Sequence, residues 1–187
     1  MSTSSVLILV VLAFVVGALV AFLGYRYYRD KRTRQIRDHF GPEYARLAKE
    51  KGAFAAEQEL ARREQRFAKF HIKPLSAELR ARFESRWQDV QKEFVDDPQG
   101  SLVAADKLLG EVMAAGGYPV RDFDQRAADL SVEHPVVVQH YHAAHRIALR
   151  HQDGQTTTED LRQAMIHYHA LFDELVADRS DHAHAAE

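Results

Sequence analysis

The chain has 187 residues, no cysteine and a formal net charge of −2 at pH 7. The absence of cysteine excludes disulfides, thiol catalysis and cysteine-ligated metal sites. The near-neutral charge argues against electrostatic binding of nucleic acid by the whole protein. A membrane anchor of about two dozen residues would leave roughly 150 residues, which is a common size for one domain, so we predict a single soluble domain.

Residues 6–23 contain only apolar side chains and glycine. As a helix that rises about 1.5 Å per residue, this run is roughly 27 Å long, close to the hydrocarbon thickness of a bilayer. A cleavable signal peptide and a buried core helix are the alternatives. Residues 1–5 offer no lysine or arginine, however, and no Ala-x-Ala site closes the run. We therefore predict a transmembrane helix within an anchor formed by residues 1–24.

An aromatic and basic segment, residues 25–42, follows the apolar run, with six basic residues and one acid between residues 26 and 37. Basic flanks stay on the cytoplasmic side of a membrane, so we expect the N-terminus outside and the rest of the chain in the cytoplasm. In a bacterium, the membrane is then the inner membrane. Specific binding of anionic lipid headgroups or of nucleic acid is an alternative role for this segment. The residues expected at the membrane interface are Tyr25, Arg26, Tyr27, Tyr28, Arg29, Lys31 and Arg32.

Residues 43–177 carry apolar side chains at helical spacing and almost no strand pattern. A helix is expected to begin near Glu43, because Gly41 and Pro42 are typical of the start of a new element. The charged stretch 57–66 is expected to be a plain helix, with a short coiled-coil arm as the alternative. Further helices are expected to be capped by Ser76, by Asp96 or Asp97, by Asp122, by Ser131, and by one of Thr156, Thr157 and Thr158.

The helix expected after Ser76 has the clearest amphipathic pattern, with apolar residues spaced four, four, three and four apart from Leu79 to Phe94. We predict an all-α fold, in which an N-terminal transmembrane helix precedes an antiparallel helical bundle of about five helices. The predicted parts are the anchor (1–24), a basic juxtamembrane segment (25–42), a soluble helical domain (43–177) and a disordered tail (178–187).

Histidine is unusually frequent, with eleven copies, nine of them at or after residue 134. Two metal ligands on one helix must lie three or four residues apart, and His142 with His145 meets that condition. His140 and His142 diverge by about 200° around a helix, as do His167 and His169. His142 and His145 are therefore the candidate metal ligands, and solvated or core-edge histidines are the alternative.

Other residues that could take part in catalysis or in phosphate binding have structural explanations. The acidic pair Asp96 and Asp97 lies beside an expected helix start, as does Asp122 with Asp124, so capping accounts for them. The two glycines at 116 and 117 lack the spacing of a phosphate-binding loop. No serine has the sequence context of a nucleophile elbow. We therefore predict no enzymatic activity, no catalytic residue and no cofactor.

Several stretches resemble a family of uncharacterised bacterial membrane-anchored proteins. They are residues 87–91, 94–98, 105–108, 117–119, 127–135 and 158–165, so the resemblance covers roughly residues 40–175. It implies a bacterial source and brings no assigned activity. In that family, arginine commonly stands where this chain has His142 and His169, which argues against metal binding by these two residues.

The sequence favours a membrane-tethered helical interaction module or scaffold, which contacts the lipid bilayer and binds a protein partner or itself, but no nucleic acid. The alternative is a ligand- or metal-responsive sensor that uses the histidine-rich C-terminal helices. A general structural role in the cell envelope or in stress response is a third class that the sequence does not separate from the first.

Overall fold

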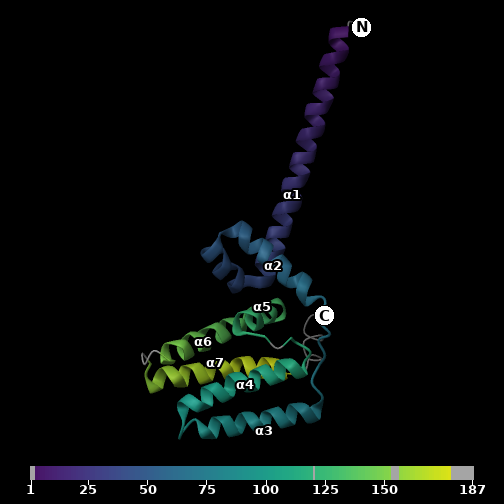
Figure 1. Cartoon of the computed structure of the whole chain (residues 1–187). Helices are drawn as coiled ribbons and strands as arrows, with labels where there is room; N and C mark the ends of the chain where they lie inside the picture. Colours follow the sequence, from purple (N-terminus) through teal and green to yellow (C-terminus); the bar gives the residue numbers. More distant parts are fainter. Residues whose placement is uncertain (1–2, 120, 153–155, 178–187) are drawn as a thin grey trace. The chain divides into compact units, whose positions relative to one another are not determined.

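The computed structural model describes residues 3–119, 121–152 and 156–177, and the side chains of 3–11, 13, 15, 151 and 152 are outside that description (Figure 1). Within these ranges, the chain forms seven α-helices and no strand. The all-α prediction is therefore confirmed. The chain divides into two compact units, Met1–His39 and Phe40–Glu187. The predicted disordered tail, residues 178–187, lies outside the described residues.

The first unit consists of most of helix α1 (Thr3–Lys51). From residue 16 to residue 32, every side chain of this helix is exposed, including the aromatic and basic ones expected at a membrane interface. Among the described residues, no helix combines the length and the apolar character of a membrane span. The predicted span, residues 6–23, includes side chains 6–11, 13 and 15, which lie outside the described residues.

The second unit begins where α1 loses helical geometry at Gly41, whose φ of 42° lies in the left-handed region. Glycine adopts that region without a steric penalty, and Pro42 follows with a fixed φ suited to the first turn of a helix. The expectation of a new helical segment near Glu43 is therefore confirmed. The remaining helices are α2 (Ala53–Phe67), α3 (Ala77–Glu93), α4 (Pro98–Ala115), α5 (Phe123–Glu133), α6 (Val138–Gln152) and α7 (Thr158–Val176).

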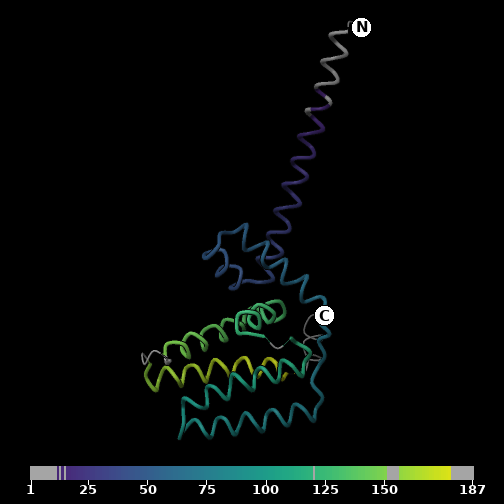
Figure 2. Tube along the Cα trace, in the orientation of Figure 1, coloured from purple at the N-terminus to yellow at the C-terminus, as the bar shows by residue number. Residues whose placement is uncertain are grey.

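Four of these helices form the main bundle, in which α3 packs on α4, α4 on α7, and α7 on α6 (Figure 1). The pairs α3–α4 and α6–α7 are antiparallel hairpins, whereas α4 and α7 run in the same direction (Figure 2). Leu102 of α4 and Tyr168 of α7 line one pocket, and Val112 of α4 and Leu175 of α7 line another. The residue numbers thus increase in the same direction along both helices, as they do when two helices are parallel. The bundle is therefore not antiparallel throughout. The reason is that the short helix α5 packs on α2 and α6 and is not a member of the main bundle.

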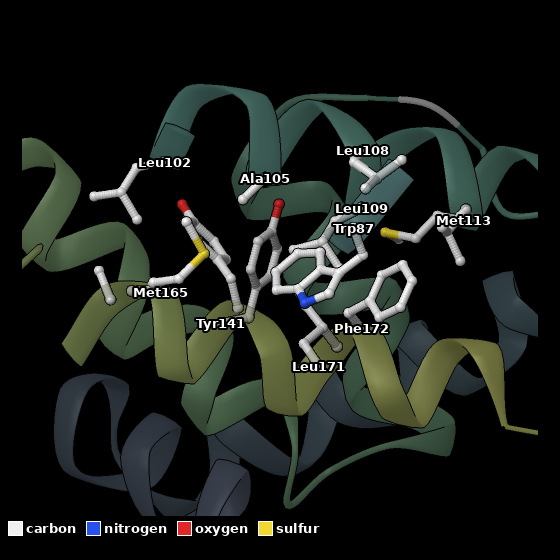
Figure 3. Close-up of a cluster of buried hydrophobic side chains, with 14 of the residues drawn as sticks. Trp87, Leu102, Ala105, Leu108, Leu109, Met113, Tyr141, Met165, Leu171 and Phe172 are labelled. Carbon is white, nitrogen blue, oxygen red and sulfur yellow. The ribbon is translucent and has the colours of Figure 1, made fainter. Parts of the chain in front are cut away.

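The core of the bundle contains the apolar faces expected from the helical spacing. Trp87 is 2% exposed, and its ring stacks on Phe172 with ring centroids 4.7 Å apart and on His169 with centroids 5.2 Å apart. The labelled core residues in Figure 3 are Trp87, Leu102, Ala105, Leu108, Leu109, Met113, Tyr141, Met165, Leu171 and Phe172. Trp87 is thus a core residue and lines none of the pockets described below.

Four of the expected helix caps are present. The side chains of Ser76, Asp97, Asp122 and Thr157 each accept a hydrogen bond from the backbone N–H three residues later. The expected cap at Ser131 is wrong, because α5 continues to Glu133 and Ser131 is buried inside it. Its hydroxyl donates to the carbonyl oxygen of Ala128, so the side chain serves a contact within the fold.

Gly117 occupies a position that only glycine fits. Its φ is 92°, and a Cβ atom there would lie 2.3 Å from the carbonyl oxygen of His71. The next glycine in sequence, Gly116, has a φ of −75°, and its Cβ would make ordinary contacts at 3.4 Å or more. The turn after α4 therefore requires glycine at position 117 and tolerates alanine at position 116.

We expect Gly117→Ala to lower the free energy of unfolding by about 2 kcal/mol or more, because it combines a left-handed backbone with a steric clash. Gly116→Ala, the matched control, is expected to change it by less than about 1 kcal/mol. Thermal and denaturant unfolding of the full chain, followed by circular dichroism, measures both. Equal destabilisation by the two substitutions would contradict the assignment.

Candidate functional site

A pocket of about 240 Å³ lies between α4, α6 and α7. Its mouth carries two exposed apolar side chains, Val103 on α4 and Leu149 on α6, which are 70% and 47% exposed. Tyr168 on α7 also lines the pocket, although it is only 2% exposed. The full lining consists of Gln99, Leu102, Val103, Asp106, His145, Ala148, Leu149 and Tyr168. The pocket thus combines an apolar wall with a few polar groups, as ligand sites commonly do.

Asp106 joins this pocket to a hydrogen-bonded cluster. Its Oδ1 accepts a hydrogen bond of 3.1 Å from the Tyr141 hydroxyl, and its Oδ2 accepts one of 2.9 Å from Nη2 of Arg126. The Arg126 guanidinium also lies 5.6 Å from the centre of the Tyr141 ring. Gly110, one turn after Asp106, leaves room for this guanidinium, since a Cβ there would lie 3.3 Å from Nη1 of Arg126.

The surroundings set the charge state of the pocket. Burial and the negative charge of Asp106 raise the pKa of both Tyr141 and Tyr168, so the two phenols stay protonated at neutral pH. Burial lowers the pKa of His145, which favours the neutral ring. The Asp106 carboxylate is balanced by Arg126, so the lining groups and their partner carry no net charge.

His142 and His145, the candidate metal ligands, both contact Phe123 but have different polar surroundings. His145 stacks on the Phe123 ring, with centroids 3.5 Å apart, and lines the pocket. His142 meets the edge of Phe123, and its Nε2 lies 3.7 Å from Oε2 of Glu43. Among the described residues, no group of three or more His, Asp or Glu side chains is placed to hold a metal ion.

A different histidine pair does meet. Nδ1 of His140 on α6 lies 2.9 Å from Nδ1 of His167 on α7, so one ring donates a hydrogen bond and the other accepts it. Burial and the neighbouring His140 lower the pKa of His167, which keeps this pair from becoming doubly charged. The spacing within one helix did not reveal the contact, because it joins residues on two helices.

A buried carboxylate, Glu43, is the centre of a second polar cluster. It is fully buried, and its Oε1 accepts hydrogen bonds of 2.6 Å from Arg46 and 2.8 Å from Arg63. Gln139 of α6 donates a further hydrogen bond of 3.2 Å to Oε2. Arg63 also donates to the Ser131 hydroxyl of α5 at 3.0 Å. The end of α1 and helices α2, α5 and α6 are thus joined through one ionic network.

Two arginines determine the ionisation of Glu43. Burial alone raises the pKa of this carboxyl, but hydrogen bonds and charge from Arg46 and Arg63 outweigh burial and bring it below its usual value. A hollow of about 460 Å³ adjoins the cluster and is lined by polar side chains of both signs, including Arg46, Glu59 and Arg66. The sequence gives no sign of this network, because Glu43 and Arg63 each have the sequence context of an ordinary surface charge.

The acidic residues considered as catalytic candidates have structural roles. Asp97 and Asp122 cap α4 and α5, as expected, while Asp96 and Asp124 are exposed beside them. The polar cluster that the sequence does not reveal consists of Asp106, Arg126, Tyr141 and Tyr168. Its members come from four helices, and no spacing along the chain relates them.

The chain shows no significant match to a known family model, to a curated protein or to a solved structure. The resemblance to a bacterial membrane-anchored family therefore stays a prediction.

The Glu43 network makes a prediction about stability. Glu43→Gln removes the buried carboxylate that Arg46 and Arg63 share, and the acidic contact that Arg63 keeps is the longer one of 3.3 Å to Glu59. We expect the free energy of unfolding to fall by about 2 kcal/mol or more. Glu50→Gln is the matched control, because Glu50 pairs with the same Arg46 at the exposed surface, where a pair contributes about 0.5 kcal/mol or less. Denaturant unfolding of the full chain at pH 7 measures both.

The pH dependence of stability tests the same network independently. Because the pKa of Glu43 is lower in the folded state, its contribution is present above the unfolded value of 4.5 and is lost as pH falls through the folded value. The unfolding free energy of Glu43→Gln should thus fall less on acidification below pH 4.5 than that of the native protein. Parallel curves would contradict a depressed pKa at this carboxyl.

Proposed function

We propose that this protein is a membrane-tethered helical binding module, in which residues 6–23 span a bilayer and the bundle binds a protein partner or a second copy of the chain. The observation that carries the proposal is the uncovered apolar surface of α1. Its described side chains before Tyr25 are exposed around the helix, namely Leu12, Phe14, Val16, Leu19, Val20, Phe22 and Leu23. A helix that is apolar on all sides is favourable only inside protein or lipid.

The residues that follow the apolar run within α1 support one orientation. Tyr25, Tyr27 and Tyr28 are exposed, as are the basic residues between them and beyond, and this combination suits a membrane interface. The proposed arrangement has the N-terminus outside and the bundle in the cytoplasm, at the inner membrane of a bacterium.

A ligand-responsive sensor is a second candidate, favoured by the pocket between α4, α6 and α7. His145 and Tyr168, both from the C-terminal helices, line it. The pocket favours a ligand over a metal ion, because His145 lines it whereas His142 lies beside Glu43 and does not.

Membrane attachment is tested by fractionation of cells that express the full chain. We expect the protein in the membrane pellet after an alkaline carbonate wash, and a reporter active only in the cytoplasm should be active when fused after Glu187. Val16→Arg with Leu19→Arg should release the protein, since each arginine at mid-membrane costs about 2.5 kcal/mol or more. Val95→Arg with Val136→Arg, on the exposed bundle surface, is the control. Release of the native protein into the carbonate wash would reject the membrane tether. Activity of a reporter that works only outside the cell would show the opposite orientation, with the bundle outside.

Binding by the bundle is tested by chemical cross-linking in intact cells, followed by extraction in mild detergent. The expected result is a discrete adduct, either a dimer or a complex of reproducible mass, that persists in the Val95→Arg and Val136→Arg control. Recovery of monomer alone under several cross-linking and extraction conditions would count against an interaction module and in favour of the ligand-responsive candidate.

A further inference from the structure

The hydroxyl of Tyr168 has no hydrogen-bond partner among the described residues. Tyr168 is 98% buried, lines the 240 Å³ pocket, and makes no hydrogen bond through its hydroxyl to any described residue. Asp106, which also lines the pocket, keeps carboxylate lone pairs beyond those that Tyr141 and Arg126 use. The pocket thus offers one donor and one acceptor to a molecule that enters it.

The size and walls of the pocket limit what can enter. A cavity of about 150 Å³ holds benzene, and drug-sized ligands occupy about 300 Å³ or more. At about 240 Å³, this pocket accommodates one substituted ring or a short chain. Leu102, Val103, Ala148 and Leu149 supply apolar contacts for that body. A ligand of this size is mostly apolar, with its polar group directed at Asp106 and Tyr168.

The charge balance of the pocket disfavours ions. Arg126 already neutralises Asp106 at 2.9 Å, the two tyrosines stay protonated, and the His145 ring is neutral. An ammonium group would add one uncompensated positive charge, and a carboxylate would add a negative charge beside Asp106. Transfer of an unpaired charge from water to such a site is costly. A neutral ligand avoids that cost.

We propose that the pocket between α4, α6 and α7 binds a small neutral alcohol or phenol, whose hydroxyl donates to the Asp106 carboxylate and accepts from the Tyr168 hydroxyl. The proposal deepens the ligand-responsive candidate function and rests on it. It does not depend on the membrane tether, because every residue involved belongs to the unit from Phe40 onward.

Three probes of one shape and different charge test the proposal. They are 4-fluorobenzyl alcohol, 4-fluorobenzylamine and 4-fluorobenzoate, titrated at pH 7 against the full chain in detergent and followed by fluorine NMR. The alcohol should bind at least about ten-fold more tightly than the ammonium and carboxylate forms, a ratio that corresponds to about 1.4 kcal/mol. Binding of all three with similar affinity, or no binding of the alcohol, would overturn the proposal.

Matched variants show where the probe binds. Because the probes partition into detergent equally for every variant, the difference in affinity between two variants does not include that partition. Tyr168→Phe should weaken binding of the alcohol about five-fold, because it removes one hydrogen bond and keeps the ring. Tyr118→Phe removes a hydroxyl that is bonded to Glu133 outside the pocket, and should leave binding unchanged. Val103→Trp at the mouth should block binding, whereas Val95→Trp, on an exposed residue elsewhere, should not.

Binding that survives Val103→Trp and Tyr168→Phe in folded protein would place the probe elsewhere and overturn the proposal. The carbonate wash of the same variants keeps the two proposals apart. Protein that stays in the membrane pellet but does not bind the alcohol rejects the ligand and leaves the tether standing. Protein that binds the alcohol but leaves the pellet rejects the tether alone.

Discussion

The buried carboxylate of Glu43 is the interaction on which the arrangement of the second unit depends. A carboxylate removed from water is stable only when its charge is balanced and its lone pairs are used. Arg46 satisfies part of that need from the same helix, and Arg63 and Gln139 supply the rest from α2 and α6. The last turns of α1 therefore have one favourable position against these helices. Displacing α2 would separate the buried charges of Glu43 and Arg63, and displacing α6 would remove the hydrogen bond from Gln139.

The network also extends beyond Glu43. Arg63 continues to Ser131 in α5, and Arg66, one turn later in α2, donates to the buried carboxylate of Asp129 at 3.0 Å. Helix α5 is short, and these bonds hold it against α2. This arrangement has a topological consequence for the rest of the bundle, because α5 is thereby removed from the row formed by α3, α4, α7 and α6.

The parallel course of α4 and α7 follows from that displacement and creates the pocket. The N-terminal half of α4 lies beside Tyr168 of α7 and the C-terminal half of α6, so Asp106, Tyr141 and Tyr168 converge. Had α5 occupied the row, α7 would have run antiparallel to α4, and Asp106 would have faced a different end of α7. The ionic network and the pocket are thus linked through the placement of one eleven-residue helix.

The sequence by itself determined the local structure. Helical spacing identified the apolar faces that contain Trp87, Leu109 and Phe172, and short side chains before helix starts identified the caps at Ser76, Asp97 and Asp122. These features depend on residues three or four positions apart, a relation that the sequence displays directly. The same holds for the apolar run and its basic flank, on which the proposed tether rests.

Only the tertiary structure decided which polar residues meet. Ser131 was expected to cap a helix, yet it accepts a hydrogen bond from Arg63, 68 residues earlier in the chain. His140 contacts His167 across 27 residues, and Asp106 meets Tyr141 across 35. Such contacts depend on the direction and order of the packed helices. That order is a property of the whole bundle, because side chains buried together must fill space and balance charge at the same time.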